Sequence, residues 1–150
     1  MRAAIAALGK LGPARASSLW HSEPLGDPDQ PWYVNAVVEL ALAPGAEPHA
    51  LLGELRALER AAGRPDARAR NAPRALDLDL LLFGSAIVRT AELTVPHPGL
   101  TRRRFVLAPL AELAPALVPP GETRSVAAML HSLDDPLRVE KLGSGTEDPR

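Results

Sequence analysis

The stretch "PRALDLDLLLFG", residues 73–84, constrains the fold of this chain more than any other. Its middle alternates two kinds of side chain, and successive side chains of a strand point to opposite faces. Four leucines fall on one face: Leu76, Leu78, Leu80 and Leu82. Asp77 and Asp79 fall together on the other face, beside Leu81 and Phe83. The pattern therefore predicts a strand over 75–83 whose leucines face a core.

Two aspartates side by side on a strand need a compensating interaction. Aspartate is depleted in strands, and two ionised carboxylates about 6 Å apart repel by roughly 2–3 kcal/mol at an effective dielectric constant of 20. Carboxylates on a rigid strand suit Mg²⁺, which takes few protein ligands and leaves positions for substrate phosphates. Such acids also bridge pairs of metal ions. The alternative is that both side chains face solvent or pair with nearby arginines.

Arginine is concentrated on both sides of this segment. Four arginines lie just upstream of the aspartates: Arg64, Arg68, Arg70 and Arg74. Arg102, Arg103 and Arg104 follow downstream, shortly after His97. Guanidinium groups bind phosphate through two parallel hydrogen bonds, so acids and arginines together indicate a site for Mg²⁺ and phosphates. For each arginine alone, a solvated surface charge is the simpler interpretation. The chain has no G-x-x-x-x-G-K-[ST] motif, which excludes a P-loop.

Composition narrows the class of protein further. The 150 residues suit one domain, and a hydrophobic content of 46% argues against disorder. The net charge of −1 gives no general attraction to nucleic acid or to an anionic membrane. The absence of cysteine excludes disulfides, thiolate metal sites and a cysteine nucleophile. No apolar run reaches 18 residues and no signal-peptide pattern begins the chain, so we expect a cytoplasmic protein without a membrane partner.

Hydrophobic spacing and turn residues predict the order of the elements. We expect helices over 1–10, 44–63, 101–113 (interrupted at Pro109) and 125–133, strands over 14–22, 32–42 and 75–83, and an extended stretch over 85–100. The order is typical of a two-layer α+β fold with helices on a sheet. It lacks one strand at its front to be a βαββαβ ferredoxin-like domain. Residues 1–135 form the expected domain, and 136–150 a disordered tail.

Aromatic residues are few, so each one carries information. Two interpretations fit Tyr33 and Phe105: the rings form a stacking slot for a flat heterocycle, or they are simply core residues. Tyr33 and Asn35 share one face of the strand predicted over 32–42, and Asn35 would supply hydrogen bonds in the plane of a bound ring. A half-buried strand fits the same pattern.

Three motifs give the chain a family resemblance. "PRALDLDLLLFG", "LTVPHPGLTRRRFVLAPLAELAP" (93–115) and "PLGDPDQPWYVNAVVEL" (24–40) resemble the 6-hydroxymethyl-7,8-dihydropterin pyrophosphokinases. The resemblance runs collinearly from Met1 to about residue 135. It implies transfer of a pyrophosphoryl group from ATP to a pterin alcohol in folate biosynthesis, leaving AMP. It also implies a ferredoxin-like two-layer α/β sandwich with an antiparallel sheet.

The resemblance implies a role for each matching position. Asp77 and Asp79 would hold two Mg²⁺ ions that bridge the ATP phosphates. The pterin would be held by Ser22, Leu25, Tyr33, Asn35 and Phe105, stacked between the two aromatic rings. The remaining positions would lie along the triphosphate or near the nucleotide: Glu59, Arg64, Arg70, Arg74, Leu80, Thr94, His97 and Arg103. Arg64 and Arg74 are expected to act with the aspartates in catalysis.

The sequence also departs from the family pattern. Glu23 stands where the family often has proline, Asp66 where a basic residue is common, and Asn71-Ala72 where Trp-Gly is common. The family's first strand and its Gly-Ser-Asn-Leu-type turn are absent from residues 1–150. We therefore expect the first, central strand of the sheet to be missing, and a version extended upstream by about twenty residues to be more stable and more active. A monomer is expected if the full fold is present.

Two other classes of function would account for parts of this sequence. A catalytically weak or inactive relative would keep part of the pterin and nucleotide surface without forming AMP. A ferredoxin-like nucleic-acid module would need aromatic residues on adjacent strands and a basic face. This chain has few aromatics and a net charge of −1, so we expect no nucleic-acid partner.

Overall fold

The computed structural model describes residues 1–63 and 76–142. The chain forms two compact units, each built from two stretches of sequence. Unit 1 comprises Met1–Ala14 and Leu40–His97, and unit 2 comprises Arg15–Glu39 and the residues from Pro98 onward. The described helices and strands agree with an α+β class. Residues 20–22 pair antiparallel with 33–35 and with 139–141, and residues 88–89 pair antiparallel with 94–95.

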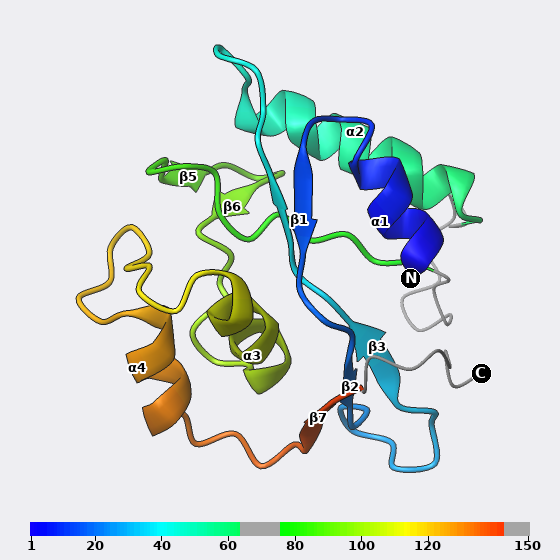
Figure 1. The fold of residues 1–150 in the computed structure, drawn as a ribbon, viewed down its shortest axis with the longest axis vertical. Helices are drawn as coiled ribbons and strands as arrows, with labels where there is room; N and C mark the ends of the chain where they lie inside the picture. The colour runs from blue at the N-terminus through cyan, green and yellow to red at the C-terminus, as the bar shows by residue number, and fades with distance from the viewer. Residues whose placement is uncertain (64–75, 143–150) are drawn as a thin grey trace. The chain divides into compact units, whose positions relative to one another are not determined.

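Unit 1 contains helices α1 (Arg2–Leu8) and α2 (Pro48–Ala61) and the hairpin of β5 (Val88–Arg89) and β6 (Thr94–Val95), as Figure 1 shows. The predicted helix over 44–63 is confirmed as α2. Pro48 stands in its first turn, where a missing N–H costs no helical hydrogen bond. Gly63 follows its end with a φ of +94°, a conformation that glycine adopts without strain. Buried side chains of this unit include Leu8, Leu55 and Val95.

The predicted strand over 75–83 is wrong as a hydrogen-bonded strand. Residues 76–83 form no strand or bridge, and their burial alternates as the pattern predicts only over 76–80, because 80–83 are all partly buried. A strand in a sheet needs a neighbouring backbone to bond with, as well as side chains that alternate between two faces. The sequence pattern shows the alternation but not the neighbour. Residue 75 lies outside the described part of the chain. The prediction of a missing central strand stays a prediction.

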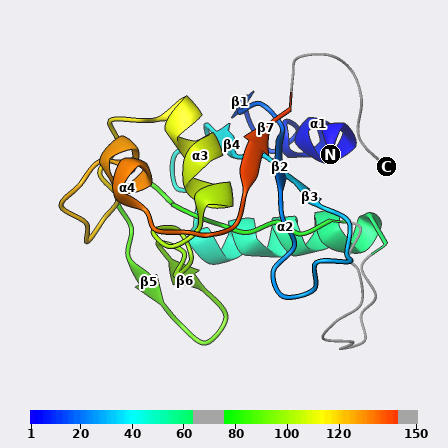
Figure 2. The same cartoon turned by 90° about the horizontal axis from the view of Figure 1, so that it is seen from below.

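Unit 2 contains a three-stranded sheet whose order is β3-β2-β7. Strand β2 (Trp20–Ser22) lies in the middle, between β3 (Tyr33–Asn35) and β7 (Val139–Lys141), and Figure 2 shows β7 beside it. Ser22 is opposite Tyr33 on one side and Val139 on the other. The tail predicted to be disordered from residue 136 therefore contributes a strand. The sequence of this stretch is short and polar and does not predict a strand. It forms one because its backbone pairs with β2.

The two long strands predicted over 14–22 and 32–42 are each split. Strand β1 (Ala14–Ala16) pairs with β4 (Val38–Leu40), whereas β2 pairs with β3 and β7. The breaks coincide at Ser17, which is buried. Its N–H donates to the Val37 carbonyl at 2.8 Å, and its Oγ accepts from the Val37 N–H at 2.9 Å. The hydroxyl thus takes the place of a backbone partner where the strands change sheets.

Helices α3 (Arg104–Leu113) and α4 (Val126–Ser132) lie side by side and form the core of unit 2 (Figures 1 and 2). Leu107, Val126 and Met129 are almost completely buried there. The predicted interruption at Pro109 is wrong, because α3 continues through it. A proline at this position removes only the helical bond to the Phe105 carbonyl, close to the start of the helix. Among the described residues, no helix is both long and apolar enough to cross a membrane.

Candidate active site

The two aspartates lie in unit 1, on the segment 76–83. Asp77 and Asp79 are exposed, and Leu76, Leu78 and Leu80 between and beside them are partly buried. The carboxylates therefore stand on the solvent side of an extended backbone whose leucines face inward, as the sequence predicts. Their four oxygens are the hard donors that Mg²⁺ prefers. Within residues 1–63 and 76–142, no group of three or more metal-ligating side chains gathers.

Hydrogen bonds at Leu78 and Leu81 help to hold the aspartate segment in place. Glu59 of α2 accepts from the backbone N–H of Leu78 through its Oε1 at 2.8 Å, and the backbone N–H of His97 donates to the Leu81 carbonyl at 2.9 Å. Glu59 is only 4% exposed. Its carboxylate meets the backbone directly between the two aspartates. The side chain of Glu59 is thus turned toward the backbone that carries them, with a positioning geometry that the sequence did not indicate.

Three further residues predicted to lie near the nucleotide belong to unit 1: Leu80, Thr94 and His97. Leu80 belongs to the segment itself and is partly buried. Thr94 is exposed on β6, opposite Arg89 of β5. His97 follows β6 and is bonded through its backbone to Leu81. Arg64, Arg70 and Arg74 lie outside the described residues.

Three of the predicted pterin residues, Ser22, Tyr33 and Asn35, gather in unit 2 on one face of the three-stranded sheet. Ser22 and Tyr33 are opposite each other on β2 and β3, so their side chains share a face. Asn35 is two residues from Tyr33 on the same face, and its Nδ2 donates to Ser22 Oγ at 2.8 Å. Ser22 is 2% exposed and Tyr33 is 52% exposed. A buried hydroxyl, a partly buried amide and an exposed ring next to each other suit a flat ligand with polar edges.

Helix α3, which carries Phe105, contacts both β2 and β3. Its first turn is held by Asp135, whose Oδ2 accepts from the Arg104 N–H at 2.9 Å. Arg103 and Phe105 flank this capped position and are both partly buried. Leu25 lies just beyond β2 and is 64% exposed. The fold therefore brings Ser22, Tyr33 and Asn35 into direct proximity and fixes the helix that bears Phe105 against their strands.

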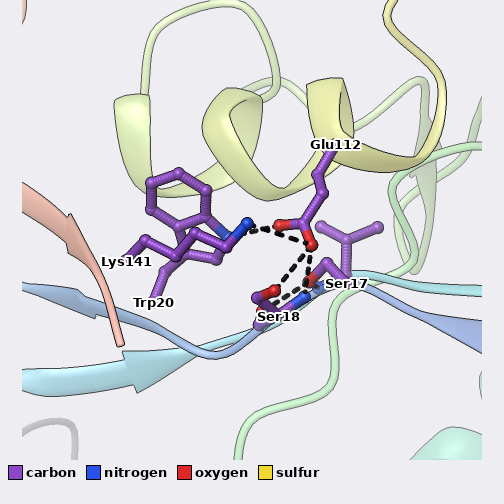
Figure 3. Close-up of polar contacts among 6 residues, drawn as sticks. Ser17, Ser18, Trp20, Glu112 and Lys141 are labelled. Atoms are coloured by element: carbon purple, nitrogen blue, oxygen red, sulfur yellow. Dashed lines mark hydrogen bonds and ion pairs between the residues drawn. The ribbon is translucent and has the colours of Figure 1, made fainter. Parts of the chain in front are cut away.

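Glu112 fastens the other end of α3 to the sheet (Figure 3). Its Oε1 accepts from the Ser18 N–H at 2.9 Å and from Ser18 Oγ at 2.7 Å, and its Oε2 accepts from Trp20 Nε1 at 3.1 Å. Lys141 of β7 approaches the same carboxylate at 3.6 Å. Burial raises the pKa of Glu112, but the hydrogen bonds from Ser18 and Trp20 and the charge of Lys141 outweigh it and leave the pKa below its ordinary value.

The reverse face of the same sheet carries a second polar cluster. The backbone N–H of Arg138 donates to Glu23 Oε2 at 2.7 Å, and its Nε donates to Glu23 Oε1 at 3.0 Å. The guanidinium carbon of Arg138 lies 5.0 Å from the centre of the Trp32 ring, and His21 packs on that ring at 4.9 Å. The hydrogen bonds from Arg138 lower the pKa of Glu23 below its ordinary value.

Comparison with known proteins decides the family. The model of the 7,8-dihydro-6-hydroxymethylpterin-pyrophosphokinase family matches residues 1–115. The chain belongs to this family. The match includes the aspartate segment, the Ser22–Tyr33–Asn35 face and the start of α3, so the resemblance carried by the three motifs is confirmed at the level of the family.

Curated members of the family are similar over most of the chain. The 2-amino-4-hydroxy-6-hydroxymethyldihydropteridine pyrophosphokinase of Haemophilus influenzae is 42% identical over 124 residues, covering 81% of this chain and 76% of the relative. That of Pseudomonas aeruginosa is 44% identical over 120 residues, covering 78% and 72%. That of Methylorubrum extorquens is 41% identical over 127 residues, covering 84% and 76%.

As a member of the pterin pyrophosphokinase family, the chain distributes its predicted site residues between the two units in a simple way. All five pterin positions belong to unit 2. All described nucleotide and metal positions belong to unit 1, with the exception of Arg103. The residues that sequence reasoning missed are Glu112 and Arg138, whose hydrogen-bond partners Ser18, Trp20 and Glu23 are more than 90 residues away in the chain. Neither spacing nor composition signals such distant pairs.

Proposed function

We propose that this chain transfers the pyrophosphoryl group of ATP to 6-hydroxymethyl-7,8-dihydropterin. The hydroxymethyl oxygen forms a bond to the β-phosphorus, the bond between that phosphorus and the oxygen bridging to the α-phosphate breaks, and AMP leaves. The hydroxyl proton is lost to solvent or a base. The observation that carries the proposal is the family match over residues 1–115, which spans the exposed aspartate pair and the pterin face.

Asp77 and Asp79 are proposed to hold two Mg²⁺ ions. Bound there, Mg²⁺ would neutralise charge on the phosphates of ATP. The fit rests on the residues themselves, because both carboxylates are exposed on one side of a backbone that Glu59 fixes between them. Arg64, Arg74, His97 and Arg103 are proposed to bind phosphate oxygens, and Arg70 to lie near the nucleotide. Guanidinium groups match phosphate geometry better than a point charge does.

The pterin is proposed to lie against the exposed ring of Tyr33, with Phe105 on its second face. Asn35 and Ser22 would read the polar edge of the heterocycle, and Leu25 would cover it from the loop after β2. Pre-placed side chains matter here because pyrophosphoryl transfer depends on in-line placement of the hydroxyl more than on a nucleophilic side chain. The Asn35–Ser22 hydrogen bond keeps the amide oriented before substrate binds.

The test is to incubate the purified chain with ATP, Mg²⁺ and the pterin alcohol and to separate the nucleotides by chromatography. The proposal expects AMP and the pterin diphosphate in equal amounts. Production of ADP, or pterin binding by calorimetry without any AMP, would overturn it, and the second result would identify a binding protein that has lost the reaction. Omission of Mg²⁺, with EDTA present, is expected to abolish turnover.

A further inference from the structure

A single guanidinium group joins the two ends of the loop that follows β2. This loop runs from Pro24 to Pro31, with Glu23 at one end and Trp32 at the other. Arg138 reaches both ends, through its Nε to Glu23 Oε1 at 3.0 Å and through its guanidinium carbon 5.0 Å above the Trp32 ring. The backbone N–H of Arg138 and the carbonyl of Arg138 add two further bonds to Glu23.

The same loop is continuous with the pterin face. Ser22 immediately precedes Glu23, and Tyr33 immediately follows Trp32. Gln30 of the loop accepts a hydrogen bond from the Tyr33 hydroxyl at 3.1 Å. Because side chains alternate along a strand, Ser22 and Tyr33 point to one face, whereas Glu23, Trp32 and Arg138 meet on the other. The cluster therefore lies behind the pterin residues and has no direct contact with that ligand face.

The energetics favour a local role over a global one. The Arg138 side chain is 67% exposed and that of Glu23 is 27% exposed. Exposed ion pairs are screened by water and salt and add little to the free energy of unfolding. Restricting a loop that carries ligand contacts, by contrast, lowers the ordering cost of binding. An exposed cluster at the base of a loop is thus expected to affect ligand affinity more than thermal stability.

We propose that Arg138 is a positioning residue for the pterin site, which sets the spacing of the two ends of loop 24–31 by holding Glu23 and Trp32 together. This inference rests on the proposed function of the loop and its neighbours. Arg138 lies beyond the residues 1–115 matched by the family model. The segment that forms β7 is then part of the substrate-binding apparatus of this chain, in addition to being an edge strand.

Lys141 provides a matched control on the same strand. It also pairs with a glutamate, Glu112 at 3.6 Å, and lies over a tryptophan ring, Trp20 at 5.9 Å, but on the other face of the sheet, which is that of Ser22 and Tyr33. Comparing Arg138→Ala with Lys141→Ala separates the loop cluster from any general weakening of β7. Arg138→Lys keeps the charge and tests whether it suffices.

The kinetic test measures AMP formation at saturating Mg-ATP. Arg138→Ala is expected to raise the KM for the pterin about three- to tenfold, with kcat and the KM for ATP within twofold of the parent. Arg138→Lys is expected to recover part of the loss, and Lys141→Ala to change the pterin KM less than Arg138→Ala does, because its contacts are with Glu112 and Trp20 and not with Glu23 or Trp32. In a Glu23→Gln background, Arg138→Ala is expected to have a smaller effect, because the two residues act as a pair. Equal pterin KM values for all these proteins would overturn the inference.

A second measurement needs no turnover, so it separates failure of this inference from failure of the proposed function. Amide hydrogen exchange of residues 24–31 is measured in the substrate-free protein. Exchange is expected to accelerate in Arg138→Ala, with no change in Lys141→Ala and with melting temperatures within about 2 °C of the parent. Unchanged exchange in Arg138→Ala, or equal acceleration in both variants, would show that the cluster does not order the loop.

Discussion

Strand β2 and the segment 76–83 both carry proposed substrate residues, but their backbones are held in different ways. β2 has a hydrogen-bonded neighbour on each side, so the position of Ser22 is fixed by two ladders. The segment 76–83 has no strand assignment and is held at Leu78 by Glu59 and at Leu81 by His97. The proposed pterin face is therefore positioned by the strand pairing of a sheet, whereas the aspartate segment is positioned by individual hydrogen bonds.

The largest expected effect concerns the aspartates. Asp77→Asn and Asp79→Asn should each lower kcat by at least about a hundredfold, because an amide cannot replace a carboxylate as a ligand of Mg²⁺. The melting temperature of Asp79→Asn should stay the same or rise, since one of two like charges is removed. Glu92→Gln, which removes an exposed carboxylate from the β5–β6 turn of the same unit, is the control and should leave kcat unchanged. Activity within a few-fold of the parent would remove the aspartates from the site.

The next effect concerns the sheet-borne face. Tyr33→Ala or Phe105→Ala should weaken pterin binding by about 1–3 kcal/mol, the loss typical of one stacking face. Tyr33→Phe keeps the ring and loses only the hydrogen bond to Gln30, so it should bind nearly as well as the parent. Calorimetry with pterin at saturating nucleotide analogue measures both. If nucleotide affinity fell in parallel, the two rings would be assigned to the core.

The contact between Glu59 and Leu78 tests how the less regular region is held. Glu59→Ala leaves the Leu78 N–H without this acceptor and should lower the free energy of unfolding by about 1–3 kcal/mol. It should also raise the KM for ATP, because the aspartates flank Leu78. Glu59→Gln retains an oxygen acceptor and should cost less in both measurements. Urea titration and steady-state kinetics would contradict this role if the two variants were indistinguishable.

The smallest expected effect is the pH dependence of the melting temperature that comes from Glu112, which joins α3 to the sheet. The pKa of Glu112 is lowered in the folded protein, below its ordinary value of 4.5. A lowered pKa stabilises the folded state above the unfolded-state value, and the contribution disappears as the pH falls through the lower folded-state value. The difference in melting temperature between the parent and Glu112→Gln should therefore be constant at neutral pH and should shrink below about pH 4.5. A difference that grew on acidification would contradict the assignment.

The sequence predicted the features that depend on residues close together in the chain. The exposure of Asp77 and Asp79 and the partial burial of the leucines beside them follow from side-chain alternation, and the existence of α2, though not its start at Pro48, follows from helical spacing and Gly63. The features that failed depend on partners distant in sequence. No hydrophobic run announces β7, and its pairing with β2 joins residues more than 100 positions apart. The hydrogen bonds of Glu112 to Ser18 and Trp20 and of Arg138 to Glu23 also join residues more than 90 positions apart, which is why the sequence did not reveal them.

The central claim is that the aspartate segment serves the nucleotide and the β2–β3 face serves the pterin. The most direct test titrates an unreactive ATP analogue with Mg²⁺ into Asp79→Asn and Tyr33→Ala, and then titrates pterin into Tyr33→Ala at saturating analogue. The account predicts that Asp79→Asn loses Mg²⁺-dependent nucleotide affinity. It also predicts that Tyr33→Ala binds nucleotide like the parent but pterin at least fivefold more weakly, which corresponds to about 1 kcal/mol. Equal weakening of nucleotide binding in both variants would contradict it.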